Sequence, residues 1–357
     1  MTTQQLDMTK VQAFAGQMVG IMNGGALVFM VAIGHEAGLF DAMAGLPPST
    51  SEQIARAAGL NERYVREWLG AMVTGRIIEY DPAKGTYSLP PEHAASVTRA
   101  AGSGNLAAMA AFYPEIGKVS EEIVHAFRNG GGVPYSSYPR FQELMRAQSA
   151  QVFDATLINA TLPLVPGLVG RLHAGIDVAD VGCGAGHAIN VMAQAFPNSR
   201  FTGYDFSAEG IDIGRREAKE IGLANAHFDV QDAAKLDVKE QFDLVTVFDA
   251  IHDQAQPRRV LKNIYSMLRS GGVFLCVDVA ASSNLEDNMQ HPLGPFLYSI
   301  STMHCMTVSL ALNGEGLGTV WGEQKARELL AEAGFPKVDA KHVEGDIMNN
   351  YYIATKS

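Results

Sequence analysis

The stretch Asp180–Gly186, DVGCGAG, constrains the fold of this chain more than any other part of it. It directly follows a short apolar run, Ile176–Val181, which predicts a buried strand, and it directly precedes a helical pattern. Gly182 and Gly184 allow the backbone to turn tightly and approach a ligand closely, and Gly186 permits close packing where the helix begins. A strand, a glycine turn and a helix in this order predict a ligand site at the end of a parallel α/β sheet.

The spacing of the glycines indicates which ligand binds there. A dinucleotide-binding loop has its third glycine one position after Gly186, and that position holds His187, which argues against a pyrophosphate ligand. An acid, Asp180, stands two positions before Gly182. S-adenosyl-L-methionine (SAM) has no phosphate and carries a positive ammonium group. We therefore predict a SAM site, in which Asp180 acts on the ammonium group through water or backbone.

Two further acids follow the next two predicted strands. Asp205 stands nineteen residues after Gly186, where a carboxylate accepts hydrogen bonds from the hydroxyls of an adenosine ribose. Phe206 is placed to lie against the adenine face, and Asp232, with Ala233 beside it, to accept the adenine amino proton. The alternative is that Asp205 and Asp232 only cap the helices that follow them.

From about residue 166 onward, predicted strands and helices alternate. FDLVTVF, residues Phe242–Phe248, is nearly continuous in apolar residues, as a strand covered on both faces should be. NNYYIATK, near the end of the chain, is typical of an edge hairpin. The pattern predicts an α/β fold with a doubly wound, mostly parallel, seven-stranded Rossmann-like sheet in residues 166–357.

Residues 1–165 are predicted to form a separate, mainly helical, winged-helix-like domain. SEQIARAAGL predicts a helix with Ser51 as its N-cap, and Asn61 opens a second helix. RIIEYDPAKGTYSL then predicts two short strands around a turn at Asp81–Gly85. Two helices followed by a β-hairpin are the order of a winged helix.

Charge and cysteine content narrow the partners and the compartment. The net charge of −11 opposes binding to phosphate backbones. Three scattered cysteines without a CxxC pair indicate a reducing cytosol and no metal site. The start, MTTQQLDMTK, lacks the basic region of a signal peptide. Gly16–Gly34 is nearly long enough to span a bilayer, but its polar residues and missing flanking charges favour a buried helix of a dimer. We expect a cytoplasmic protein.

Asp180–Gly186, Asp205, Asp232 and the stretch FDLVTVFDAIHD resemble the successive motifs of class I SAM-dependent methyltransferases. The preceding winged-helix region makes the whole chain similar to the small-molecule O-methyltransferases of plants and bacteria. The resemblance implies a homodimer joined through the N-terminal helices, an acceptor enclosed by both domains, and S-adenosyl-L-homocysteine as product. It also implies that Asp249, at the end of the fourth strand, contributes to the cofactor site.

In that family a His-Asp pair after the fourth strand supplies the base that deprotonates a hydroxyl acceptor. His252 and Asp253 match this pair, and Asp278 matches the acid that orients the histidine. A histidine suits proton removal near neutral pH. Gln254 replaces the usual tryptophan, and the family's second acid has no counterpart. Methylation at nitrogen, carbon or sulfur, with a structural His252, therefore stays open.

Two segments are candidates for the acceptor pocket. The apolar stretch after Asp278 offers Phe296, Tyr298, Met303, His304 and Trp321. PYSSYPRFQELM is typical of a lid and offers Tyr138, Phe141 and Met145. Ordinary packing of each of these side chains is the alternative. A different kind of function, a winged-helix transcription regulator that senses SAM, also remains, although residues 1–165 hold 11 Lys/Arg against 14 Asp/Glu.

Overall fold

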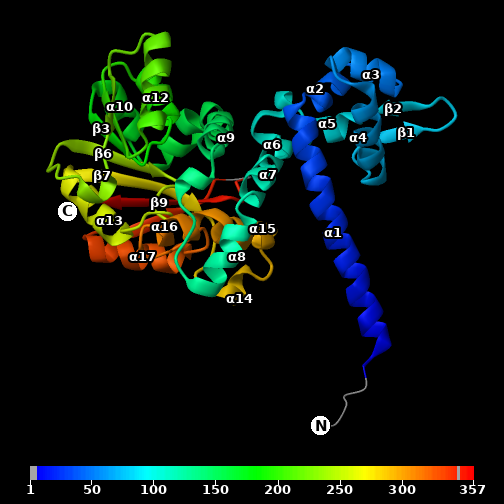
Figure 1. Ribbon diagram of the computed structural model, residues 1–357. Coiled ribbons are helices and arrows are strands. Elements are labelled where there is room, and N and C mark those ends of the chain that lie inside the picture. Colours follow the sequence, from blue (N-terminus) through cyan, green and yellow to red (C-terminus); the bar gives the residue numbers. More distant parts are fainter. Residues whose placement is uncertain (1–5, 344–345) are drawn as a thin grey trace. The chain divides into compact units, whose positions relative to one another are not determined.

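The computed structural model of the protein describes residues 6–343 and 346–357 (Figure 1). The chain forms two compact units that divide between Glu115 and Ile116. The predicted domain boundary near residue 165 lies inside the second unit, just before the helix that leads into the sheet. It stays a prediction of where the sheet domain begins.

The first unit has the predicted order of a winged helix. Its helices are α1 (Met8–Glu36), α2 (Leu39–Ala44), α3 (Ser51–Ala58), α4 (Glu62–Thr74), α5 (Pro91–Val97), η1 (Arg99–Gly104) and α6 (Leu106–Ala110), and α7 (Phe112–Gly117) spans the division. The strands β1 (Glu79–Asp81) and β2 (Thr86–Ser88) pair antiparallel as the wing. The apolar faces of α2, α3 and α4 pack together around Phe40 and Trp68, whose rings meet edge to face.

The predicted N-cap of α3 is wrong by one residue. The cap is Thr50, whose hydroxyl accepts from the backbone N–H of Gln53, while the Gln53 side chain accepts from the N–H of Thr50. This is a capping box. Ser51 instead occupies the first helical position, and its hydroxyl donates to Glu62 across the unit, 2.6 Å away.

Helix α1 exposes apolar side chains around most of its length. Its exposed large apolar residues include Met8, Val11, Phe14, Met18, Val19, Ile21, Met22, Phe29 and Ile33. The most apolar 18-residue window is only 11% buried within the chain, and the helix is long and apolar enough to cross a membrane. The chain alone therefore leaves a large apolar surface uncovered at α1.

The second unit is built on a seven-stranded sheet with the order β5-β4-β3-β6-β7-β9-β8. Its strands are β3 (Asp177–Val181), β4 (Arg200–Asp205), β5 (Ala226–Val230), β6 (Phe242–Phe248), β7 (Leu268–Val279), β8 (Val338–Lys341) and β9 (Asn349–Thr355). The pairs among β3 to β7 are parallel, and β9 pairs antiparallel with β7 and β8. The predicted sheet is confirmed, and the NNYYIATK strand, β9, pairs antiparallel with the edge strand β8, as expected of an edge hairpin.

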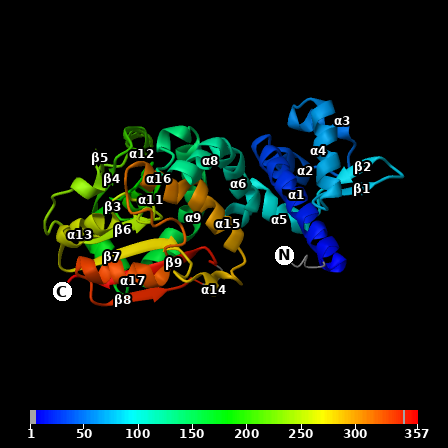
Figure 2. The same cartoon turned by 60° about the horizontal axis from the view of Figure 1, so that its bottom comes forward.

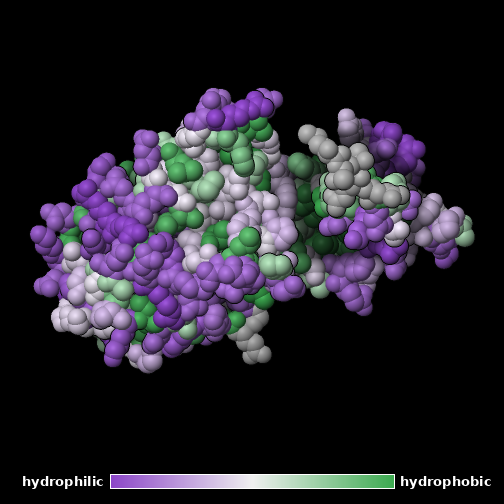
Figure 3. Space-filling view, turned by 90° about the horizontal axis from the view of Figure 1, so that it is seen from below, coloured by the Kyte–Doolittle hydropathy of each residue, from purple (hydrophilic) through white to green (hydrophobic). Residues whose placement is uncertain are grey.

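Helices cover both faces of this sheet (Figures 1 and 2). One core joins the sheet to α10 (Leu168–Ala174), α11 (His187–Ala195) and α12 (Ala208–Glu220). The other joins it to α13 (Pro257–Met267) and α17 (Gly322–Ala333). On the face shown in Figure 3, the outer surface of this unit is largely hydrophilic.

The remaining helices of the second unit lie in its connections. They are α8 (Ser120–Asn129), η2 (Tyr135–Ser137), α9 (Phe141–Thr156), η3 (Leu157–Thr161), η4 (Leu162–Leu164), η5 (Ala233–Lys235), α14 (Leu285–Asn288), α15 (Gly294–Ile300), the π-helical η6 (Ser301–Cys305) and α16 (Met306–Ala311). The strand order reverses between β3 and β6. The carboxyl ends of these two strands form the switch point at which doubly wound sheets bind ligands.

Candidate active site

The glycine loop joins β3 to α11 at the switch point. Gly182, Gly184 and Gly186 all have a positive φ, between 53° and 75°, which favours glycine. A Cβ atom at Gly186 would lie 2.2 Å from the ring of Phe228, and one at Gly182 would lie 2.6 Å from Ala250 Cβ. At Gly184 the nearest atom would be 3.8 Å away. Two glycines therefore serve close packing, while Gly184 borders open space.

Replacing Gly186 with alanine is expected to lower the free energy of unfolding by about 2–5 kcal/mol. A left-handed backbone costs a non-glycine residue about 1–2 kcal/mol, and overpacking against Phe228 adds about 1–3 kcal/mol. Urea denaturation measures the change. Gly170→Ala, in α10 with open space around its Cβ, is the control and should not destabilise. Equal stability of both variants would contradict this account of the loop.

Asp205, at the end of β4, fixes the glycine loop. Its Oδ2 accepts from the N–H of Gly184 at 2.8 Å, and its Oδ1 accepts from the N–H of Ser207 at 2.8 Å. Burial raises the pKa of Asp205, and these backbone hydrogen bonds oppose the rise. Each carboxylate oxygen can accept a second hydrogen bond. The side chain therefore retains the capacity that a ribose hydroxyl pair requires.

The other predicted adenosine contacts lie on the same side of the sheet as Asp205. Phe206 is half-exposed, and Ala233 is buried at the start of η5. Asp232 caps η5 by accepting from the N–H of Ala234 at 2.9 Å, and it forms an ion pair with Lys235. Asp232 thus caps a helix, as the alternative interpretation of this residue expects. The contact of Asp232 with adenine stays a prediction.

Two more carboxyl groups are buried at the ends of β3 and β6. Asp180 Oδ1 accepts from the hydroxyl of Thr246 at 2.7 Å, and burial raises the pKa of Asp180 to about 7. Asp249 has a positive φ of 50°, and its Oδ1 is buried without a hydrogen-bond partner among the described residues. Burial and the neighbouring Asp278 raise the pKa of Asp249 to about 7. Buried acids of this kind suit the positive ammonium group of SAM.

His187 stands where a dinucleotide-binding loop has its third glycine. Its side chain connects three helices through hydrogen bonds. Its Nδ1 bonds Glu217 Oε1 of α12 at 2.7 Å, and its Nε2 bonds Asp154 Oδ1 of α9 at 2.9 Å. The hydrogen bond to Glu217 is the largest contribution that raises the pKa of His187. The histidine thus holds α9 next to the glycine loop.

His252 and Asp278 form a buried pair at the ends of β6 and β7. His252 Nδ1 lies 2.7 Å from Asp278 Oδ1, which also accepts from the N–H of Val279. The two residues are 5% and 0% exposed. Burial by itself lowers the pKa of His252, but Asp278 and the adjacent thiol of Cys305 raise it well above its usual value. The acid is thus hydrogen-bonded to the ring, and its orienting role in catalysis stays a prediction.

Asp253 has a partner that the sequence does not reveal. The hydroxyl of Tyr135, in η2, donates a hydrogen bond to its carboxylate. Burial raises the pKa of Asp253 to about 6, while His252 and Tyr135 oppose the rise. The two residues are 118 positions apart, so only the aromatic character of the lid sequence hinted at a role for Tyr135.

Residues 130–141, the covering segment, are held against η6 and α16 by hydrogen bonds. The backbone N–H of Val133 donates to the hydroxyl of Thr307 at 2.9 Å, and the Tyr138 hydroxyl donates to the carbonyl of Met303. A Cβ at Gly132 would lie 1.9 Å from the Thr307 carbonyl oxygen. The backbone of the segment therefore rests directly on α16.

Three rings of the covering segment, Tyr135, Tyr138 and Phe141, gather around the ring of His304. The ring of His304 stacks on Phe141, with centroids 3.5 Å apart and planes 10° apart. It meets Tyr138 edge-on at 4.7 Å and Tyr135 at 5.3 Å. Tyr135 also contacts Phe206, at 5.4 Å. The structure thus brings together predicted pocket residues from both candidate segments, on the same side as Phe206.

The other predicted pocket residues are distributed differently. Met303 and Phe296 pack near Cys305. Tyr298 is 36% exposed, and its hydroxyl accepts from Asn288. Met145 lies half-buried in α9. Trp321 is buried in the core between the sheet and α17, where it packs with Phe274 and Leu329 rather than with the four rings. Its role in the pocket stays a prediction that this packing does not support.

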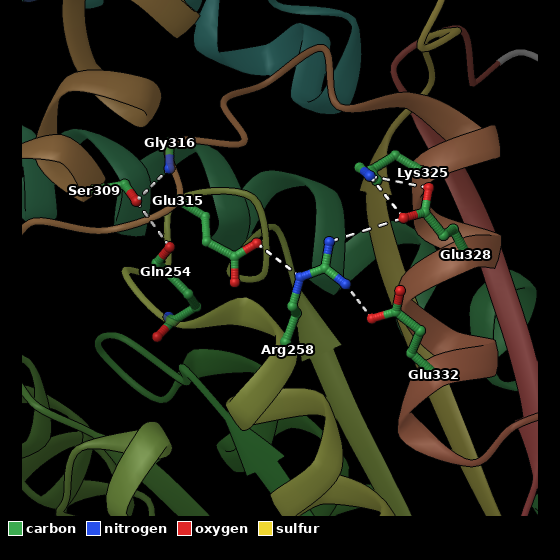
Figure 4. A network of polar contacts seen from close by, with 8 residues as sticks. All are labelled: Gln254, Arg258, Ser309, Glu315, Gly316, Lys325, Glu328 and Glu332. Atoms are coloured by element: carbon green, nitrogen blue, oxygen red, sulfur yellow. Dashed lines mark hydrogen bonds and ion pairs between the residues drawn. The ribbon is translucent and has the colours of Figure 1, made fainter.

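A polar network connects α16 and the glycine-rich segment after it to the loop that carries His252 (Figure 4). Ser309 Oγ donates to the carbonyl of Gln254 at 2.9 Å and accepts from the N–H of Gly316 at 3.1 Å. Arg258 contacts Glu315, Glu328 and Glu332. The glycine-rich segment after α16 is thereby held against the end of β6. Within the described residues, no three His, Cys, Asp or Glu side chains are grouped as a metal site.

Family comparisons divide the chain in the same order as the fold. Residues 25–99 match the Rv2258c-like winged HTH domain, and residues 172–334 match the methyltransferase domain. The fold of the whole chain is shared with human N-acetylserotonin methyltransferase, solved with SAM, at 18% identity and a TM-score of 0.68, with 100% of both chains covered. Mitomycin 7-O-methyltransferase gives a TM-score of 0.71 at 16% identity, covering 97% of this chain and 99% of its own.

Two curated relatives match part of the chain. Demethylmenaquinone methyltransferase from Listeria welshimeri is 31% identical over 112 residues, 31% of this chain and 48% of the relative. Fatty-acid O-methyltransferase from Mycolicibacterium smegmatis is 33% identical over 147 residues, 41% of this chain and 47% of the relative. The match thus spans about half the length of each relative.

Proposed function

We propose that this chain, a winged-helix domain followed by a methyltransferase domain of the class I SAM-dependent fold, methylates a small apolar or aromatic acceptor at a hydroxyl group. The products would be the methylated acceptor and S-adenosyl-L-homocysteine. The observation that carries the proposal is the buried His252–Asp278 pair at the sheet edge that bears the glycine loop. The names of the two relatives add support, since demethylmenaquinone and fatty acids are apolar molecules.

The residues of the switch point suit SAM. The loop Gly182–Gly186 would pass beside it, Asp205 would accept from the ribose, and Phe206, Asp232 and Ala233 would contact adenine. Asp180 and Asp249 would face the ammonium group, since Asp249 Oδ1 is buried without a partner in the described part of the chain. When bound, SAM supplies an electrophilic methyl group on a sulfonium.

His252 is the proposed base. An aspartate on one ring nitrogen holds the histidine in one tautomer and stabilises the imidazolium that forms when the other nitrogen takes a proton. Asp278 meets this requirement at 2.7 Å. Asp253, tied to Tyr135, adds a second buried carboxyl group next to the ring. The covering segment and the ring cluster would exclude water from the acceptor hydroxyl.

A methyl-transfer assay with mass-spectrometric detection tests the function. The full chain would be incubated with SAM and a panel of phenols, naphthols and fatty acids, and the products analysed for added methyl groups. A methylated hydroxyl supports the proposal. Methylation only at nitrogen, carbon or sulfur would leave the enzyme class intact and remove the role of His252 as a hydroxyl base.

We propose further that the protein is a cytoplasmic homodimer, with α1 against a second copy of the chain. Val11, Phe14, Met18 and Ile21 follow at three- and four-residue steps, so they lie on one face of the helix. All four are exposed in the single chain. A second copy would cover this face, whereas the polar side chains of Gln17 and Asn23 within the helix disfavour a membrane span.

The double substitution Phe14→Glu with Ile21→Glu is expected to convert the dimer to a monomer. Burying each apolar side chain contributes about 1.5–3 kcal/mol, so the dissociation constant should rise by at least ~100-fold. Light scattering after size-exclusion chromatography measures the mass. Gln12→Glu with Gln17→Glu adds the same charge to the same exposed helix as control. A variant mass equal to that of wild type would place the interface elsewhere.

The alternative function of a transcription regulator depends on whether the winged-helix domain can bind DNA. In α4, which would be the DNA-reading helix, Arg63 pairs with Glu67 and Arg66 with Glu62. Arginines neutralised by acids on their own helix are poor contacts for phosphates. We therefore propose that nucleic acid is not a partner. Specific binding of duplex DNA in a mobility-shift assay would favour the regulator instead.

A further inference from the structure

His304 is a buried histidine whose hydrogen-bonding groups are unused. The residue is 1% exposed, and neither of its ring nitrogens has a hydrogen-bond partner among residues 6–343 and 346–357. Leaving a buried polar group unpaired costs free energy, so native proteins do so rarely and often at functional sites. A neutral imidazole offers one donor and one acceptor.

The backbone that carries His304 is also unusual. η6 (Ser301–Cys305) is π-helical, between the α-helices α15 and α16. Single π-helical turns inside α-helices occur frequently at functional sites. The same turn places Cys305 against His252, the proposed base. A molecule that bonds to His304 therefore lies close to the group that would remove its proton.

The surroundings of His304 specify the shape of such a molecule. Phe141 lies face to face with the imidazole ring, and Tyr138 and Tyr135 meet its edges. No acid is among the groups that perturb the histidine; burial and the nearby His252 lower the pKa of His304 to about 3. A neutral imidazole among aromatic rings offers flat faces that suit the stacking of another planar aromatic molecule.

We propose that His304 is the specificity-determining residue for the acceptor: it hydrogen-bonds the hydroxyl or a neighbouring oxygen of a flat aromatic acceptor, whose ring takes the place of Phe141. The chain's own phenylalanine shows that a flat ring can stack on this imidazole. The inference rests on the proposed methyl transfer, and it narrows the acceptor from apolar molecules in general to hydroxylated aromatic rings.

Equilibrium dialysis with the full chain, preloaded with S-adenosylhomocysteine, tests the inference. The probes are 2-naphthol, naphthalene and myristic acid. Wild type is expected to bind 2-naphthol at least ~10-fold more tightly than naphthalene, because only the naphthol can pair with His304. In His304→Phe the ratio of the affinity for 2-naphthol to the affinity for naphthalene should fall to about one. In His304→Gln this ratio should lie between one and the wild-type value. His125→Phe, on the exposed side of α8, is the control.

Two further measurements distinguish recognition of the acceptor by His304 from a purely structural role of this residue. His304→Phe should melt at or above the wild-type temperature, because it removes two unpaired nitrogens. Phe141→Ala should bind 2-naphthol as well as or better than wild type, because the ring position is vacated. A naphthol-to-naphthalene ratio unchanged in His304→Phe, tighter binding of myristic acid than of 2-naphthol, or weaker naphthol binding by Phe141→Ala would overturn the proposal.

Binding of S-adenosylhomocysteine distinguishes failure of this inference from failure of the proposed function. If wild type fails to bind S-adenosylhomocysteine, the proposed function falls, and this inference falls with it. If it binds S-adenosylhomocysteine but discriminates among the probes without His304, the methyltransferase function stands and only the assignment of the acceptor class is overturned.

Discussion

Replacing Asp205 with alanine is expected to weaken the binding of S-adenosylhomocysteine by at least ~100-fold. The carboxylate would lose its hydrogen bonds to the ribose, and a hydrogen bond to a charged group contributes about 1.5–3 kcal/mol. The loss also releases the N–H of Gly184, which Asp205 holds at 2.8 Å, so the glycine loop is no longer fixed. Isothermal titration calorimetry of the full chain with SAM and S-adenosylhomocysteine measures both affinities.

A matched control separates this effect from a general loss of charge. Asp212 is an exposed aspartate on α12 that pairs only with Arg215 among the described side chains. Asp212→Ala should bind S-adenosylhomocysteine like wild type. Near-normal binding by Asp205→Ala would remove the ribose role, and the absence of binding by wild type would remove the SAM site altogether.

The second large effect concerns the proposed base. His252→Ala should slow methyl transfer to a hydroxyl by about 10²–10⁴-fold, the usual contribution of a general base, while leaving the affinity for S-adenosylhomocysteine unchanged. Initial rates with saturating SAM and calorimetry with the product measure the two quantities. His227→Ala, on the exposed edge strand β5, is the control. Equal rates in wild type and His252→Ala would make the histidine structural.

The pH profile gives an independent readout of the same residue. Asp278 and Cys305 raise the pKa of His252 well above its usual value, and the ring must lose its proton before it can act as a base, so the base form becomes available at a higher pH than for an ordinary histidine. The rate should therefore increase from neutral into alkaline pH in wild type. The ion pair between protonated His252 and Asp278 stabilises the folded protein fully at pH values below the pKa that His252 has in the unfolded chain. This stabilisation is lost as the pH rises through the higher pKa of His252 in the folded protein.

Much of the sheet domain was predictable because its signals are local. The apolar run Phe242–Phe248, for example, predicts a strand with the bounds that the structure has. The capping box of α3 was missed by one residue because Ser51 and Thr50 can both cap. Only the tertiary contact of Ser51 with Glu62 distinguishes them.

The site was predictable only along the strand ends. Asp180, Asp205, Asp249 and His252 each lie at or just after the carboxyl end of a strand, and parallel strands bring such residues to one edge. The partner of Asp253 comes instead from Tyr135, in a segment without regular periodicity. Trp321 was expected in the pocket because it is aromatic and lies in an apolar stretch, yet the same properties place it in the core. Residue type alone does not separate a pocket wall from packing.

The contact between Gly132 and α16 bears on how this protein could be re-engineered. A Cβ at residue 132 would lie 1.9 Å from the Thr307 carbonyl oxygen. Any other residue there would therefore clash with α16 and displace the covering segment from it. Larger acceptors would gain room, and water would gain entry along with them. Because residue 132 has no Cβ, the covering segment can lie close to α16. The same close contact limits the size of the acceptor and keeps solvent away from the reacting groups.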